Sequence, residues 1–171
     1  MSARHVMDAE TRAARDDHGA IRLWLRLLAT NRLVETRTRR LLQERYATTL
    51  PRFDLMAQLQ RNPRGLRMTE LSRRLMVTSG NVTRITDQLV AEGLVRREPD
   101  PEDRRAFVVK LTPAGRRLFD RMAAAHEAWI AELFAGLGAG DLRRLYALLA
   151  KLKGHVAALQ ASQSEPQGRA R

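Results

Sequence analysis

Apolar residues in the first third of the chain recur with the period of an α-helix. From about Asp16 onward they follow steps of three, four and seven: Ile21, Trp24, Leu25, Leu28, Val34, Leu41 and Leu42. This helix should end before Pro51, because proline pushes the preceding residue out of helical geometry. A second helix follows, capped by Thr49 and ended by Asn62-Pro63-Arg64-Gly65. Its apolar stripe is Phe53, Leu55, Met56 and Leu59.

Two short helices separated by a tight turn follow this break. Thr69 is expected to cap the first, which directs Leu71, Leu75 and Met76 inward. Thr78 is expected to cap the second, which spans residues 78–92 and ends at Gly93, a residue suited to the left-handed conformation after a helix. Val82, Ile85 and Leu89 form a narrow buried stripe. The predicted outer face is polar: Ser79, Gly80, Asn81, Thr83, Arg84, Thr86 and Asp87.

The hydrophobic period then changes from that of a helix to that of a strand. Residues 94–98 and 105–111 both have strand character, and in the second Phe107, Val109 and Leu111 alternate with more polar or smaller residues. The charged, turn-rich segment 99–104 separates them. The pattern predicts a β-hairpin that projects from a helical body.

The C-terminal third returns to helical periodicity. Thr112-Pro113 begins a long helix, glycines 136, 138 and 140 interrupt it, and a last helix extends to about Gln160. The first helix and these last two carry more apolar surface than one small domain covers. Dimerisation through them accounts for the surplus, and a monomeric helical bundle is the alternative. Residues 161–171 are almost devoid of apolar side chains and are expected to be disordered.

These elements predict a mainly α-helical winged helix-turn-helix protein with long terminal dimerisation helices. The expected parts are a flexible N-terminus (1–15), a first dimerisation helix (16–50), a DNA-binding lobe (51–111) with recognition helix 78–92 and wing 94–111, C-terminal dimerisation helices (112–160) and the tail (161–171).

The helix–turn–helix–hairpin order favours binding to double-stranded DNA. The major groove admits one helix with a hydrogen-bonding outer face, and a basic hairpin tip suits the minor groove. Candidate contacts are Thr69, Arg73, Arg74, Thr78, Ser79, Gly80, Asn81, Thr83, Arg84, Asp87, Asp103, Arg104 and Arg105, with Arg64 and Arg67 as further phosphate contacts. An ordinary helical hairpin followed by a solvated turn is the alternative interpretation.

Composition adds a net charge of +12 and excludes several classes of chemistry. The charge favours acidic partners, although it is spread evenly and only three of the 31 basic residues are lysine, a bias that genome composition also produces. The chain has no cysteine, which excludes disulfides and thiol chemistry. Its four histidines lack metal-ligand spacing and no phosphate loop or nucleophile elbow is present, so neither a cofactor nor an enzymatic activity is expected. With no membrane-length apolar run and no signal-like N-terminus, we expect a cytoplasmic protein with no membrane partner.

The sequence from about residue 18 to 160 resembles the MarR family of bacterial transcriptional regulators. The resemblance is carried by Thr69–Ser72, Gly80–Arg84, Glu92–Val95, Asp103–Ala106 and Leu111–Gly115. It implies an obligate homodimer whose first and last two helices interleave, and it implies that Arg105, held by Asp103, enters the minor groove. Such a dimer would read an inverted repeat.

The resemblance also implies a small aromatic effector bound between the dimerisation region and the DNA-binding lobe. Trp24, Phe53, Asp54 and His126 are the candidate ligand-binding residues, while core packing is an equally open interpretation of Trp24 and Phe53. The segments 21–26 and 50–58 look like those of members that control aromatic-acid catabolism, which favours an aromatic acid or its coenzyme A thioester.

Three further features narrow the choice of effector. Arg37, Arg39 and Arg40 could meet coenzyme A phosphates, but a solvated helix face explains them better. Members that respond to urate carry an arginine where Ile85 stands, and the missing cysteine excludes the thiol-based peroxide sensors. The leading function is a ligand-released repressor. The alternatives are a DNA-binding activator or architectural protein without effector and a helical interaction module that binds no DNA.

Overall fold

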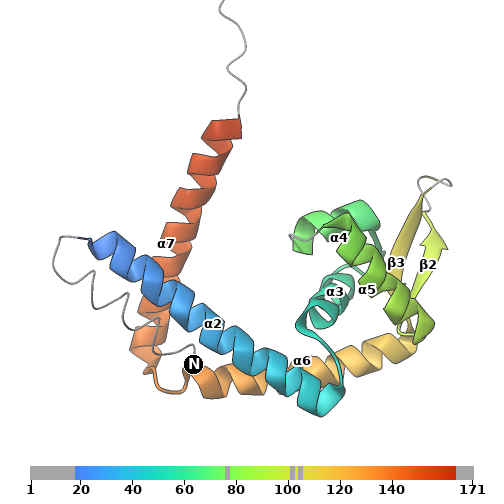
Figure 1. Cartoon of the computed structure of the whole chain (residues 1–171), viewed down its shortest axis with the longest axis horizontal. Coiled ribbons are helices and arrows are strands. Elements are labelled where there is room, and N and C mark those ends of the chain that lie inside the picture. The colour runs from blue at the N-terminus through green and yellow to red at the C-terminus, as the bar shows by residue number, and fades with distance from the viewer. Residues whose placement is uncertain (1–17, 76–77, 101–102, 104–105, 165–171) are drawn as a thin grey trace, which may run out of the picture. The chain divides into compact units, whose positions relative to one another are not determined.

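The computed structural model describes residues 18–164 except 76–77, 101–102 and 104–105. The chain divides into two compact units, Met1–Trp129 and Ile130–Arg171. The elements, in order, are α2 (Gly19–Tyr46), α3 (Leu50–Arg61), β1 (Leu66–Arg67), α4 (Met68–Leu75), α5 (Ser79–Ala91), β2 (Val95–Pro99), β3 (Phe107–Leu111), α6 (Pro113–Phe134) and α7 (Ala139–Ser164) (Figure 1). The predicted mainly helical fold with one hairpin is confirmed.

The ends of the predicted segments differ in a few places. Helix α7 extends to Ser164, four residues into the tail that composition predicted to be disordered. The expected flexible N-terminus (1–15), Met76 and the arginines at 104 and 105 lie outside the described residues.

A three-stranded antiparallel sheet with strand order β1-β3-β2 supports the hairpin. Leu66 and Arg67 of β1 pair with Val109 and Val108 of β3, and β2 pairs along the whole of β3 from Val95↔Leu111 to Pro99↔Phe107. Strand β1 was not predicted, because two residues are too few to show a period. It makes β3 the central strand of the sheet.

The predicted burial of Phe107 is wrong. Phe107 is 56% exposed, whereas Val108 and Val109 are both buried. Phe107 lies at the tip end of β3, where it pairs with Pro99 of β2 and where β1 no longer pairs with the strand. Buried and exposed side chains alternate strictly only in a strand that has one covered face along its whole length.

The core of the first unit joins α2, α3, α5, the sheet and α6. Its fully buried members include Leu42, Leu55, Leu89, Val109 and Met122. The apolar stripe predicted for the first helix is buried only near its C-terminal end, at Leu41 and Leu42. Ile21 and Trp24 at the other end are exposed by 50% and 61%.

The helix ends show which capping predictions hold. Gly93 has φ +67°, as predicted for a residue that follows a helix. Thr78 and Thr49 occupy the capping positions of α5 and α3 in extended geometry, although neither side chain makes the capping hydrogen bond. Thr69 is not a cap, because α4 already begins at Met68.

Helix α6 begins in close contact with the first residues of the hairpin. The Thr112 hydroxyl donates to the carbonyl oxygen of Gly93 at 2.7 Å and accepts a hydrogen bond from the backbone N–H of Gly115 at 3.0 Å. A Cβ atom placed on Gly115 would lie 1.9 Å from the carbonyl oxygen of Leu94. The hairpin and α6 therefore meet backbone to backbone, at a place that only glycine permits.

Candidate DNA-binding surface and ligand pocket

Helix α5 buries one face and exposes a polar one. Val82, Ile85 and Leu89 are buried. Thr83 Oγ1 donates to the carbonyl oxygen of Ser79 at 3.0 Å, and Arg84 Nη2 donates to Asn81 Oδ1 at 3.1 Å. A side-chain amide and a guanidinium on one exposed face are groups that hydrogen-bond base edges in the major groove. The predicted contacts that are exposed here are Thr78, Ser79, Gly80, Thr83, Arg84 and Asp87, and Asn81 is half-buried.

Thr86, which was predicted on this outer face, is instead fully buried. It follows Val82 by four residues and precedes Leu89 by three, so the buried stripe of α5 is wider than the apolar residues alone indicate. Among the described residues its hydroxyl oxygen has no hydrogen-bond partner. A threonine is compatible with either face by size, which is why the pattern misplaced it.

An ion pair connects the wing to the recognition helix. Arg97 of β2 donates from Nη2 to Asp87 Oδ1 of α5 at 2.6 Å, and both side chains are partly exposed. Exposed pairs contribute little to stability. This one also offsets the negative charge of Asp87, which would repel DNA phosphates. The sequence identified Asp87 as a contact but gave no sign of its partner.

A second group of charges lies on the wing itself. Glu98 forms two ion pairs. Its Oε2 lies 2.7 Å from Lys110 Nζ, and its Oε1 lies 2.6 Å from Arg96 Nε. The hydrogen bond from Lys110 lowers the pKa of Glu98, and together with the attraction of both cations it outweighs the opposing effect of desolvation. Two cations around one carboxylate leave this surface net positive.

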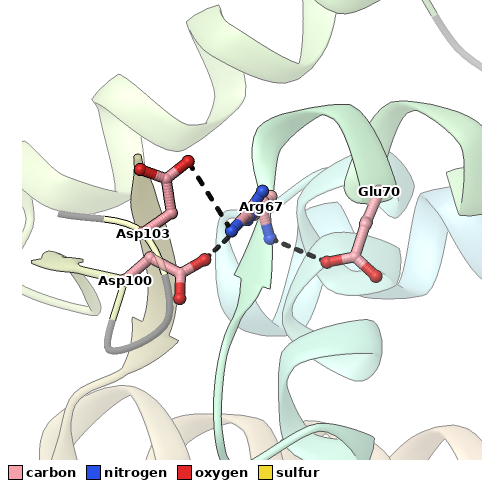
Figure 2. A network of polar contacts seen from close by, with 4 residues as sticks. All are labelled: Arg67, Glu70, Asp100 and Asp103. Carbon is pink, nitrogen blue, oxygen red and sulfur yellow. Dashed lines mark hydrogen bonds and ion pairs between the residues drawn. The ribbon is translucent and has the colours of Figure 1, made fainter. Parts of the chain in front are cut away.

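Two carboxylates at the tip of the hairpin contact one arginine of β1. Arg67 Nε donates to Asp100 Oδ2 at 2.5 Å, and Arg67 Nη2 lies 4.0 Å from Asp103 Oδ2 (Figure 2). Asp100 is buried and Asp103 is about half exposed. Asp103 thus lies at the predicted place on the wing, while its expected partner Arg105 and the neighbouring Arg104 lie outside the described residues.

Arg64 is exposed between α3 and β1, and the remaining DNA candidates belong to α4. Thr69, Arg73 and Arg74 are all exposed. Arg74 also lines a pocket, which the sequence did not indicate. Of the two adjacent arginines on α4, only Arg74 therefore lines the pocket.

A pocket with a volume of about 440 Å³ lies between α3, α4 and α6. Volumes of this size suit small organic ligands. The ring of Phe53 stacks on Phe119, with centroids 5.4 Å apart, and lies 4.9 Å from the ring of His126. The full lining is Phe53, Asp54, Ala57, Gln58, Arg61, Arg74, Leu75, Phe119, Ala123 and His126. An aromatic wall and a polar rim are thus brought together.

Burial shifts the two titratable groups in the pocket that the sequence predicted. Desolvation raises the pKa of Asp54, and the nearby Glu35 raises it further, while Arg39 and Arg61 oppose the shift. Desolvation lowers the pKa of His126, which favours the neutral ring at pH 7.

Three of the four predicted ligand residues therefore share one pocket, and Trp24 does not. Phe53, Asp54 and His126 line it, whereas Trp24 lies on an exposed part of α2 and is not packed in the core of its unit. Arg61 was missed, because a helix-terminal arginine looks the same in sequence whether it faces solvent or a pocket.

Two of the three arginines proposed for coenzyme A phosphates form ion pairs within their own helix. Arg39 contacts Glu35 at 2.5 Å and Arg40 contacts Glu44 at 2.7 Å, each one turn away. Such pairs are typical of a solvated helix face. The structure therefore favours that interpretation for these two residues.

The described part of the chain offers neither a metal site nor a membrane-spanning helix. Within it, no group of three or more acidic or histidine side chains is arranged to hold a metal ion. No described helix is long and apolar enough to span a bilayer.

The helix-turn-helix, its recognition helix and the attached three-stranded wing define a winged helix-turn-helix protein. The family model of MarR matches residues 48–107. A crystal structure of a MarR family transcriptional regulator from Silicibacter pomeroyi is 34% identical, with a TM-score of 0.71, and the match covers 83% of this chain and 99% of that one. The chain belongs to the MarR family of transcriptional regulators.

Other relatives extend the comparison. Wild-type MarR from E. coli in its apo form is 27% identical over 74% of this chain and 93% of its own, with a TM-score of 0.66. Sco3205, a MarR family regulator from Streptomyces coelicolor solved in complex with DNA, is 26% identical over 85% of this chain and 87% of its own, with a TM-score of 0.66. An uncharacterized HTH-type regulator of Bacillus subtilis, YkoM, is 36% identical over 85 residues, which span half of this chain and 55% of that relative.

Proposed function

We propose that the protein is a homodimeric, sequence-specific DNA-binding repressor that a small aromatic acid releases from its operator. The observation that carries the proposal is the exposed polar face of α5 beside a cationic wing in a chain of this family. Helix α5 would enter the major groove and the hairpin tip the adjacent minor groove. The solved DNA complex of Sco3205 supports this use of the fold by analogy.

Exposed apolar side chains on the long terminal helices support a dimer. In α7 the residues Leu142, Leu145, Leu149, Leu152, Val156 and Leu159 repeat at alternating steps of three and four, and Leu152 is 42% exposed. Such a seam is typical of helices that pack on one another. A second copy of the chain is the proposed partner. A two-fold dimer places its recognition helices about one turn of DNA apart, so an inverted repeat is expected as its operator.

DNA binding is tested by mobility shift on the DNA upstream of the protein's own gene. The wild type is expected to bind, and its affinity should fall steeply with salt because arginines displace phosphate counterions. Arg105→Ala is expected to weaken binding by about tenfold or more, since minor-groove potential attracts arginine. An unchanged affinity would remove the wing from the mechanism.

The pocket supports an anionic aromatic ligand. Phe53 and Phe119 offer stacking surface, and the guanidinium groups of Arg61 and Arg74 provide donors for a carboxylate at the rim. No described carboxylate forms an ion pair within 4.0 Å of either arginine. The volume fits a single-ring acid, and a coenzyme A thioester would have to extend beyond it.

Neighbouring arginines on α4 test whether the pocket is the effector site, because only one of them lines it. Arg74→Gln is expected to lower the affinity for benzoate by about tenfold, because a charge-assisted hydrogen bond is lost. Arg73→Gln is the matched control, since Arg73 is exposed but does not line the pocket. Calorimetric titration with benzoate and benzoyl coenzyme A measures both variants. Equal benzoate affinity of Arg74→Gln and the wild type would move the effector site elsewhere.

A DNA-binding activator or architectural protein without effector is the alternative function. It shares the winged helix-turn-helix but leaves the pocket without a role. Mobility shifts with and without the acids distinguish the two, because only a ligand-released repressor loses its operator when the acid is added. A transcription assay on the same DNA then separates repression from activation.

A further inference from the structure

Residue 67 connects the tip of the wing to the first helix of the helix-turn-helix. Arg67 is the last residue of β1, and α4 begins at the next residue without a loop. Its side chain extends to Asp100 and Asp103 of the hairpin tip, as Figure 2 shows. This side chain therefore joins two parts of the DNA-binding lobe that lie more than 30 residues apart in sequence.

The backbone of Arg67 is fixed on the helix side. Its register partner is Val108 at the centre of the sheet. Its N–H donates to Glu70 Oε2 at 3.1 Å, which satisfies one of the free donors at the start of α4 in the manner of a capping box. Gly65, two residues earlier, has φ +94°, and a Cβ there would lie 3.0 Å from Val108 Cβ. The guanidinium thus extends from an anchored point.

Backbone hydrogen bonds close the hairpin tip that carries Asp100 and Asp103. The Asp100 N–H donates to the carbonyl oxygen of Ala106 at 2.9 Å, and the Ala106 N–H donates to that of Asp103 at 2.8 Å. The Asp100 side chain is only 8% exposed. A buried carboxylate loses much of its hydration, so a cation in direct contact with it matters more than at an exposed site.

The end of the hairpin lacks a third strand at the point where Arg67 reaches it. Strand β1 pairs with β3 only at Val108 and Val109, so the pair Pro99↔Phe107 belongs to a two-stranded ribbon. Two-stranded ribbons twist more than wider sheets. A contact that holds such a tip therefore fixes its angle to the recognition helix.

We propose that Arg67 is a positioning residue for DNA binding, which clamps the wing tip to the start of α4 through Asp100 and Asp103. The proposal rests on the proposed DNA-binding function. In it, Arg67 acts through the wing, since its guanidinium is engaged by the tip carboxylates. A direct phosphate contact is the simpler role for Arg67, and it predicts a different result when the carboxylate of Asp100 is neutralised.

Opposite charge changes at the two ends of the clamp distinguish these roles. Arg67→Ala removes a positive charge and Asp100→Asn removes a negative one. If only charge mattered, Asp100→Asn would bind DNA more tightly than the wild type. The clamp predicts that both variants bind the upstream DNA about tenfold more weakly, as expected when a charge-assisted hydrogen bond that orients a binding element is lost. Hydroxyl-radical footprints should lose the minor-groove protection at the flanks first.

Glu98→Gln is the matched control for charge on the wing. It also removes one carboxylate from the hairpin, but Glu98 pairs with Lys110 and Arg96 and not with Arg67. This variant is expected to bind DNA as tightly as the wild type or more tightly. Asp100→Asn affinity equal to or above that of the wild type would overturn the clamp.

Hydrogen exchange tests the clamp on the free protein, independently of DNA. The amides of Asp100 and Ala106 are expected to exchange about tenfold faster in Arg67→Ala and Asp100→Asn, while those of α5 keep their wild-type rates. Unchanged exchange at both amides in both variants would refute the proposal. If the wild type binds no DNA, the proposed function fails, and the exchange rates still decide whether the clamp exists. Should Arg67→Ala not fold, Asp100→Asn alone decides both measurements.

Discussion

Gly115→Ala is expected to lower the free energy of unfolding by about 3 kcal/mol or to prevent folding, because it forces overlap between two backbones. The new Cβ would lie 1.9 Å from the carbonyl oxygen of Leu94 and 2.8 Å from its carbonyl carbon. Neither atom can rotate away as a flexible side chain would. Relief requires α6 to move off the start of the hairpin, which breaks the Thr112 hydrogen bonds to Gly93 and Gly115.

Gly80→Ala is the control for this experiment. A Cβ on Gly80 has no neighbour within 4 Å, and alanine favours helix over glycine by up to about 1 kcal/mol. Urea unfolding should therefore show Gly80→Ala equal to or slightly above the wild type. If Gly115→Ala were as stable as the wild type, the backbones of α6 and Leu94 could not be in direct contact.

Leu152→Glu is expected to convert a dimer into monomers. Leu152 lies in the middle of the apolar seam of α7, and placing a carboxylate in the core of an interface costs far more than the lost apolar contact. The dissociation constant of the dimer should rise by about a hundredfold or more. Light scattering after size-exclusion chromatography should give twice the chain mass of 19.4 kDa for the wild type and the single mass for the variant.

Lys153→Glu controls for the introduced carboxylate. Lys153 is the next residue, exposed and outside the seam, so this variant should remain dimeric. Loss of sequence-specific DNA binding in Leu152→Glu together with its dimer would link the two proposals. A wild type that is monomeric at micromolar concentration would contradict the dimer model.

The parts of the fold with a strong period were predictable from sequence. Helices α2, α3, α5 and α6 extend over several turns, and Gly93 and Pro113 mark a helix end and a helix start. Strand β1 was not predictable, since its two residues pair only because the hairpin brings β3 beside them. The exposure of Phe107 and the burial of Thr86 depend on neighbours from other elements in the same way.

The candidate sites show the same division. Residue types and spacing identified the outer face of α5, and the family resemblance led to Asp54 as a ligand residue. Partnerships across the fold left no trace in the sequence. Asp87 with Arg97, Arg67 with Asp100 and the pocket position of Arg74 each join residues from different elements. A single sequence carries no record of such pairs.

Helix α3 has a consequence for signalling that follows from two of its consecutive residues. Arg52 forms an ion pair with Glu92 at the end of α5, while the next residue, Phe53, is part of the pocket wall. The first turn of α3 thus contacts both the pocket and the C-terminal end of the recognition helix. If the proposed effector binds this pocket and displaces the turn, the ion pair would move the C-terminal end of α5 with it, which would couple ligand binding to DNA binding within one subunit.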